Sequence, residues 1–200
     1  MHPPPRIAPR NPALESRPWS HLSDAEWDAL RPHVENAGAG RPIPELRLRM
    51  DAIFQAVMAR GLPWSSFRSP YGRTDTIHRH FRRLAHAGVW TALLKRVARR
   101  RAPRPLRDIR DWVCAAHRRA IRIIGLRGIV LARRLGLHRA LPGPSWLLPD
   151  PDLSETMKAV QIHLLRDLAN PELPRLLRII RSVLLRIGRR GRIPRCLEPA

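Results

Sequence analysis

Residues 45–88 have the sequence ELRLRMDAIFQAVMARGLPWSSFRSPYGRTDTIHRHFRRLAHAG, and two helical patterns lie within it. Between Leu46 and Met58, apolar residues fall at positions i, i+4, i+7, i+8, i+11 and i+12. This spacing is typical of one face of an amphipathic helix. Gly61 suits the C-terminal cap of that helix, and Pro63 prevents its continuation.

A second amphipathic helix is predicted from Thr74, its expected N-cap, to Gly88. Its inward residues recur at i, i+4, i+7 and i+8 and are Ile77, Phe81, Leu84 and Ala85. Between the two helices, Trp64 and Phe67 predict a short helical element, which a Ser/Pro/Gly turn follows. The whole segment therefore has the form of a helix-turn-helix.

The outward face of the 74–88 helix is polar and cationic, which suits a helix that reads a DNA major groove. The residues that we predict to contact bases are Thr76, His78 and Arg79, with Arg79 bidentate to guanine. The residues that we predict to contact phosphates are Arg73, Arg82, Arg83, His86 and Arg96. His78 and His80 are expected to flank the face. On charge alone, a solvated face of an ordinary bundle helix is an equally good interpretation.

The charge of the chain favours a polyanionic partner. Lys and Arg number 38 against 16 Asp and Glu, which gives a formal net charge of +22 in 200 residues. Each cation placed against a phosphate releases a condensed counterion. GC-rich coding explains why only Lys95 and Lys158 are lysines, but it does not explain the deficit of carboxylates.

The remaining composition excludes several classes of protein. Cys114 and Cys196 are too few for a disulfide framework or a zinc module, so a reducing cytoplasm is expected. No charge-free apolar stretch approaches the roughly 18 residues of a membrane span, and no secretory signal is recognisable. Continuous β-type alternation is absent, so the expected fold class is all-α.

Helical patterns continue on both sides of the helix-turn-helix. Ser23 and Glu26 form a capping box that predicts a helix from Asp24 to Asn36. Further helices are expected over residues 89–97, 106–124, 152–168 and 173–187, whereas 129–135 is either a helix or a strand. The predicted organisation is a disordered Pro/Arg-rich tail (1–18), a helix-turn-helix domain (19–101), a basic helical accessory or oligomerisation region (102–188) and a basic tail (189–200).

Several short motifs, taken in order, resemble the N-terminal domain of insertion-element transposases. They include Leu22-Ser23-Asp24-Ala25-Glu26-Trp27, Gly61-Leu62-Pro63-Trp64, Thr76-Ile77-His78-Arg79 and Ala87-Gly88-Val89-Trp90, within a match over about residues 19–97. In that family a helix-turn-helix domain precedes a DDE catalytic domain and recognises the terminal repeats of the element. The resemblance implies double-stranded DNA as partner, and a bacterial cytoplasmic location in association with the nucleoid.

A DDE catalytic domain is not expected in this chain. In a DDE domain, three carboxylates on an α/β core hold two metal ions. About 95 residues follow Pro105 in this chain, which are too few to form such a core. Asp108 and Asp111 are expected to pair with Arg107 and Arg110, whereas Asp150 and Asp152 are expected at a helix start. We therefore predict no catalytic residue, no metal site, no cofactor and no enzymatic activity of the chain alone.

Two weaker patterns lie in the second half of the chain. Cys114 and His117 could supply half a metal site, but a buried thiol beside a partly exposed imidazole is the preferred interpretation, as is a core position for Trp112. The Leu173–Ile187 stripe could pack on the preceding helix, pair with a second copy or lie on an anionic membrane. We prefer the intramolecular hairpin, in which Leu153, Met157, Val160, Leu164 and Leu168 face inward.

These observations predict a DNA-binding protein that uses residues 45–87 and has no strand-transfer chemistry of its own. Its expected protein partner is a second copy or the full-length transposase. One alternative is a component of a split transposase that contributes to phosphodiester cleavage. The other is a basic helical protein that binds RNA or an anionic membrane.

Overall fold

A computed structural model describes residues 17–35, 43–59, 62–145, 148, 150–168 and 170–187. These residues form helices and no strand, so the all-α prediction is confirmed. The elements are α1 (Asp24–Val34), α2 (Leu46–Met58), η2 (Trp64–Ser66), α3 (Thr74–His86), α4 (Val89–Val97), α5 (Arg104–Asp108), α6 (Arg110–Ile124), α7 (Leu126–Arg134), η3 (His138–Ala140), α8 (Pro151–Leu164) and α9 (Leu173–Ile187). The predicted tails, 1–18 and 189–200, lie almost wholly outside the described residues.

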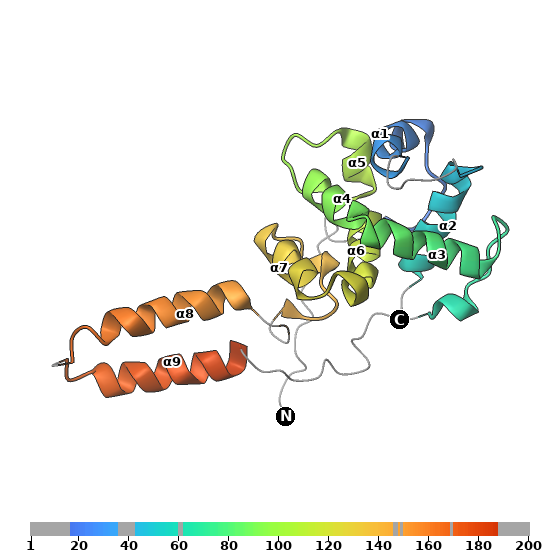
Figure 1. Cartoon of the computed structure of the whole chain (residues 1–200). Coiled ribbons are helices and arrows are strands. Elements are labelled where there is room, and N and C mark those ends of the chain that lie inside the picture. The colour runs from blue at the N-terminus through green and yellow to red at the C-terminus, as the bar shows by residue number, and fades with distance from the viewer. Residues whose placement is uncertain are drawn as a thin grey trace, which may run out of the picture.

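The helices from α1 to α7 form one packed body, and α8 and α9 extend from it as a hairpin (Figure 1). Helix α6 lies at the centre of the body, where it packs against α2, α3, α4, α7 and η3. The rings of Phe54, Trp90 and Trp112 meet in the core, with centroids 6.2 Å apart for Phe54 and Trp90 and 5.7 Å for Phe54 and Trp112. A single apolar core therefore joins residues on both sides of position 101, where the sequence predicts a domain boundary.

The capping box at the start of α1 is present as predicted. The Glu26 amide donates to the Ser23 hydroxyl oxygen at 3.3 Å, and the Ser23 amide donates to the Glu26 carboxylate at 2.9 Å. These two bonds satisfy amides that have no partner within the helix. Helix α1 ends at Val34, slightly before the predicted end at Asn36, which lies outside the described residues.

The start of α3 differs from the prediction by one residue. Thr74 is not the N-cap: the helix begins at Thr74, and Arg73 precedes it as a cap without a side-chain hydrogen bond. The Thr74 hydroxyl instead donates to the Phe67 carbonyl at 2.8 Å, which ties α3 to the end of η2. The short element predicted at Trp64 is the 3₁₀ turn η2.

In the second half, the segment 106–124 is divided at Ile109 into α5 and α6, and residues 126–134 form a helix rather than a strand. Gly125 joins α6 to α7 with φ 73° and ψ −154°, a backbone conformation that is essentially confined to glycine. A Cβ at Gly128 would lie 3.2 Å from side-chain atoms of Ile121 and Ile124. The missing side chain therefore lets α7 lie close against the end of α6.

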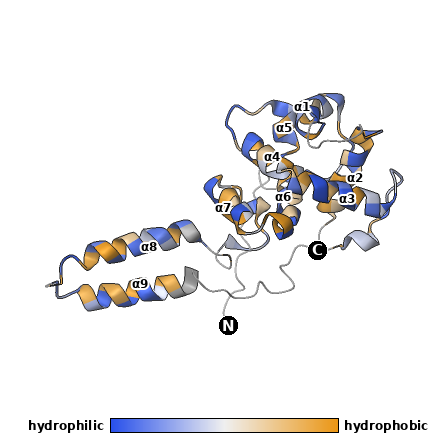
Figure 2. Ribbon diagram, in the orientation of Figure 1, coloured by the Kyte–Doolittle hydropathy of each residue, from blue (hydrophilic) through white to orange (hydrophobic). Residues whose placement is uncertain are grey.

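The hairpin of α8 and α9 confirms the intramolecular packing, but its apolar face is only partly covered. Asp150, rather than Asp152, caps α8 by accepting from the Leu153 amide at 3.2 Å. The predicted inward positions of Leu153, Val160 and Leu168 are wrong, because these side chains are 40%, 39% and 74% exposed. Helix α9 covers one side of α8 only, and Leu168 lies beyond the end of α8 at Leu164. Hydrophobic residues consequently remain visible along the hairpin (Figure 2).

Two ion pairs attach the hairpin to the body. Arg133 pairs with Asp150 at 3.0 Å, and Arg134 pairs with Asp152, so consecutive residues of α7 hold the first turn of α8.

Among the described residues, no helix has the length and apolar character needed to cross a membrane.

Candidate nucleic-acid interface

Helix α3 is fixed in the body by its apolar face. Ile77, Phe81, Leu84 and Ala85 are buried, as predicted, and the helix packs against α2, α4 and α6. The Trp90 indole N–H of α4 donates to the Phe81 carbonyl at 3.3 Å. The outward side chains of α3 are therefore presented by a rigid support.

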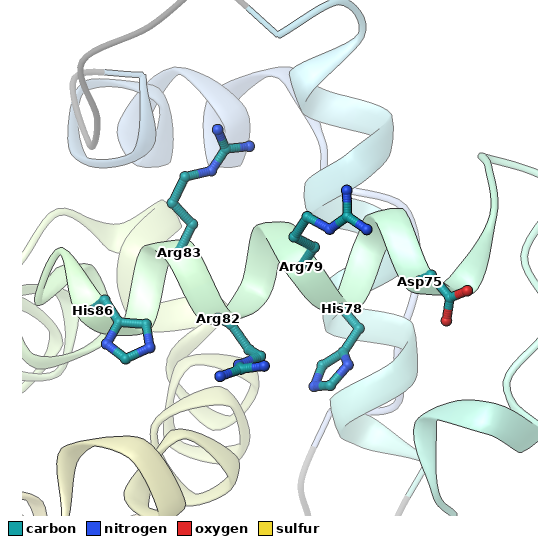
Figure 3. Close-up of a pocket in the computed structure, with 6 residues that line it drawn as sticks. All are labelled: Asp75, His78, Arg79, Arg82, Arg83 and His86. Atoms are coloured by element: carbon teal, nitrogen blue, oxygen red, sulfur yellow. The ribbon is translucent and has the colours of Figure 1, made fainter.

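The outward face of α3 bears a shallow open hollow. Its lining residues are Asp75, His78, Arg79, Arg82, Arg83 and His86. Figure 3 shows Arg79 and Arg83 extending to one side of the helix axis, whereas His78, Arg82 and His86 extend to the other. Two rows of cationic or titratable side chains thus flank one helix, with a single carboxylate at its N-terminal end.

The arginines of this face differ from many arginines elsewhere in the chain. Arg17, Arg47, Arg133 and Arg139, for example, each pair with a carboxylate. Within the described ranges, by contrast, Arg79, Arg82 and Arg83 make no ion pair with a carboxylate. Their charge is therefore available to an external anion.

His78 lies at the edge of the hollow and is half-buried. Its ring stacks on Trp64 of η2, with centroids 5.0 Å apart and an interplanar angle of 25°. Burial, and then the charges of Arg82 and Arg119, lower the pKa of His78 below its ordinary value, while Asp75 opposes the shift. The lowered pKa favours the neutral imidazole, which offers a ring edge rather than a charge.

The other predicted contact residues lie outside the hollow. Thr76 is exposed on the flank of α3, and Arg73 is exposed at its start. Arg96 lies on α4, and its Nε is buried without a hydrogen-bond partner, so the structure does not bring it together with the α3 residues.

His80 does not flank the outward face, contrary to the prediction. It is 3% exposed and lies on the buried side of α3, three residues after Ile77 and four before Leu84. Its pKa is lowered to about 4, first by burial and then by the charges of Arg83 and Arg49. His80 therefore belongs to the support of the face, not to the face itself.

A buried arginine, which the sequence analysis did not single out, supports η2. Arg119 of α6 is 8% exposed, and its guanidinium donates to the carbonyls of Ala56 at 3.1 Å and Leu62 at 2.8 Å. It also lies 4.6 Å from the ring centroid of Trp64, which stacks on His78. Burial, followed by neighbouring arginines, lowers its pKa to about 10, so it remains charged at pH 7.

A second long-range support joins the chain before α1 to the turn before α3. Buried Asp51 accepts from the Leu22 amide at 2.9 Å and from His21 Nδ1 at 3.3 Å. His21 Nε2 lies 3.1 Å from the Tyr71 hydroxyl, within hydrogen-bond distance. We call this connection the Asp51–His21–Tyr71 clasp.

The other candidate site residues of the second half lie in the core or in an ion pair. Asp111 pairs with Arg139 rather than with the neighbouring arginines of its own segment, because η3 packs against α6. Cys114 is a buried thiol, as preferred, and burial raises its pKa to about 12. His117 is fully buried, so its predicted partial exposure is wrong, and Trp112 is in the core as expected. Across the described ranges, no group of three or more His, Cys, Asp or Glu side chains could hold a metal ion.

The fold and this face define an all-α protein that displays one arginine-rich helix on a packed helical body. Residues 22–94 match the family described as "Putative transposase of IS4/5 family (DUF4096)". The match contains all of α3 and confirms the resemblance of this segment to an insertion-element transposase. No curated protein and no solved structure matches the chain.

Proposed function

We propose that the chain binds duplex DNA by placing α3 in the major groove. The observation that supports this proposal most strongly is the exposed arginine face of α3, whose charges are not neutralised by carboxylates of the described residues. A groove of B-DNA accepts one α-helix and is bordered by phosphates on both sides. The description of the matched family favours DNA over other polyanions.

In this proposal the side chains of α3 divide into two groups. Arg79 contacts guanine, and Thr76 and His78 contact neighbouring base edges near the helix N-terminus. Arg82, Arg83 and His86 contact phosphates on the two sides of the groove, where they fix position without reading sequence. Arg73 and Arg96 contact phosphates further away.

We further propose that the chain alone performs no strand transfer. Three of the four carboxylates of the second half that the sequence analysis considered are engaged in ion pairs: Asp111 with Arg139, Asp150 with Arg133 and Asp152 with Arg134. A two-metal site needs carboxylates that converge on the metal ions. The partner that supplies the chemistry would be a full-length transposase, and a homodimer would double the DNA contacts.

The experiment is a selection from a random duplex library, followed by binding of the selected duplex to the purified chain. Arg79→Ala is expected to lower affinity by about 1–3 kcal/mol and to relax sequence preference. Arg82→Ala is expected to weaken binding to all duplexes and to reduce the salt slope by about one.

Arg31→Ala is the matched control, because Arg31 is exposed on α1 and pairs with Glu35. Unchanged retention of the duplex by an Arg79/Arg82/Arg83 triple-alanine variant would refute the proposal. Equal or stronger binding to RNA or anionic vesicles would favour those partners instead. Nicking of the duplex in Mg²⁺ by the chain alone would refute the absence of catalysis.

A further inference from the structure

We infer that Asp75 determines sequence specificity by accepting a hydrogen bond from the N4 amino group of a cytosine near the guanine read by Arg79. The inference rests on the proposed insertion of α3 into the major groove. Asp75 is the one carboxylate among the six side chains that line the hollow.

The position of Asp75 places it with the base-reading residues. It is exposed in the first turn of α3, four residues before Arg79, so the two side chains start about 6 Å apart along the helix axis. That distance corresponds to one or two base-pair steps of B-DNA, at about 3.4 Å each. Figure 3 shows the Asp75 carboxylate at the N-terminal end of α3, pointing downward, whereas the Arg79 guanidinium lies above the helix.

Asp75 makes no hydrogen bond or ion pair within the part of the chain that the structure describes, unlike the first-turn carboxylates of other helices, and its charge acts on nearby His78. Asp24 of α1 pairs with Arg47, Asp111 of α6 with Arg139, and Asp152 of α8 with Arg134. The start of α3 has no side-chain cap bond either. The structure therefore assigns Asp75 no hydrogen bond or ion pair that would explain an aspartate at this position.

Electrostatics restricts what the carboxylate can contact in a groove. A phosphate repels it, so Asp75 weakens sequence-independent binding, and only a donor on a base edge offers a favourable contact. Adenine presents the N7 acceptor beside its N6 amino group, whereas the hydrogen-bonding group of cytosine in the major groove is the N4 donor alone. A carboxylate is therefore matched to cytosine, just as the Arg79 guanidinium is matched to guanine.

The test measures the affinity of the wild-type chain and its variants for the selected duplex and for duplexes changed at one base pair. The wild type is expected to lose at least about tenfold when the cytosine read by Asp75 is replaced. Asp75→Asn is expected to replace the cytosine preference with one for adenine, whose N6 donor and N7 acceptor match an amide, while keeping the preference at the guanine. Asp75→Ala is expected to bind unrelated duplexes more tightly than the wild type does.

Asp75→Glu and Asp28→Asn are the controls. Glutamate keeps the negative charge near the helix N-terminus but moves the carboxylate by one methylene. If Asp75 only stabilised the helix dipole, Asp75→Glu would keep the base preference of the wild type. Asp28 is an exposed carboxylate on α1 and controls for net charge. Thermal unfolding of each variant shows whether α3 is still folded.

The outcomes separate this inference from the proposed function. If the wild type selects a sequence and Asp75→Asn keeps the same preference at every position, the inference is wrong and the proposed function stands. If the wild type prefers no duplex, the proposed function fails and the inference fails with it. Replacement of the cytosine preference alone, in folded Asp75→Asn, supports both.

Discussion

Acidification is expected to destabilise the protein through His80, which lies on the buried side of α3, beneath its arginine-rich face. The ring is 3% exposed, and Arg83 and Arg49 are the charged groups that act on it. Its pKa is about 4 in the folded chain against an ordinary value of 6.5. The unfolded chain therefore binds a proton between pH 6.5 and 4 that the folded chain does not bind, and stability is lost as the pH falls through this window.

The size of the effect follows from the two pKa values. One pKa unit corresponds to about 1.4 kcal/mol, so His80 accounts for a loss of about 2 kcal/mol between pH 7 and pH 4.5. Arg83 Nη2 also lies 3.5 Å from His80 Nδ1, and protonation would remove this acceptor.

The assay is urea unfolding of the wild type and of His80→Leu at pH 7 and pH 4.5, followed by circular dichroism. The leucine variant is expected to lose less stability than the wild type on acidification, by about 2 kcal/mol. His86→Ala is the control, since His86 is exposed on the same helix. An equal loss in the wild type and in His80→Leu would refute the reasoning.

Three further predictions concern the support of α3. Gly125→Ala is expected to lower the free energy of unfolding by about 1–3 kcal/mol, measured by thermal unfolding, because the backbone conformation at Gly125 is essentially confined to glycine. The loss is not steric, since a Cβ at this position meets nothing within 4 Å. Asp51→Ala is expected to lower the free energy of unfolding by about 1–3 kcal/mol in urea, since the buried Leu22 amide loses its acceptor. A fragment that ends at Leu94 is expected to give no cooperative thermal transition, whereas one that ends at residue 145 gives one, because only the longer fragment contains α6. Wild-type stability of either point variant, or cooperative melting of the shorter fragment, would contradict these expectations.

The helices were largely predictable because they depend on local periodicity. The apolar spacing after Leu46 and before Gly88 identifies α2 and the buried face of α3. The same reasoning failed for Leu153 and Val160, because periodicity defines a face but not whether another element covers it. It also assigned Thr74 to a cap, although tertiary structure gives its hydroxyl another acceptor at Phe67.

The candidate site was predictable to the extent that it lies on one helix. His80 could have been placed correctly, since it shares the face of Ile77 and Leu84. A pattern of cationic side chains does not single out Asp75, although it lies one helical turn before Arg79. The contact between Arg119 and the Ala56 carbonyl spans 63 residues, and local spacing contains no signal for it.

The support of α3 extends beyond the segment that matches the transposase family. The match ends at residue 94, yet α6 packs against α2, α3 and α4. From α6, Arg119 donates to the Leu62 carbonyl and lies over the Trp64 ring on which His78 stacks. Removing α6 would take the fully buried Trp112 out of the core and expose the faces of α2, α3 and α4 that pack against it. The hairpin, by contrast, is attached through Asp150 and Asp152 to two arginines of α7. We therefore infer that residues 104–145 are required for α3 to keep its position, and that the hairpin is the part of the second half most readily separated from DNA binding.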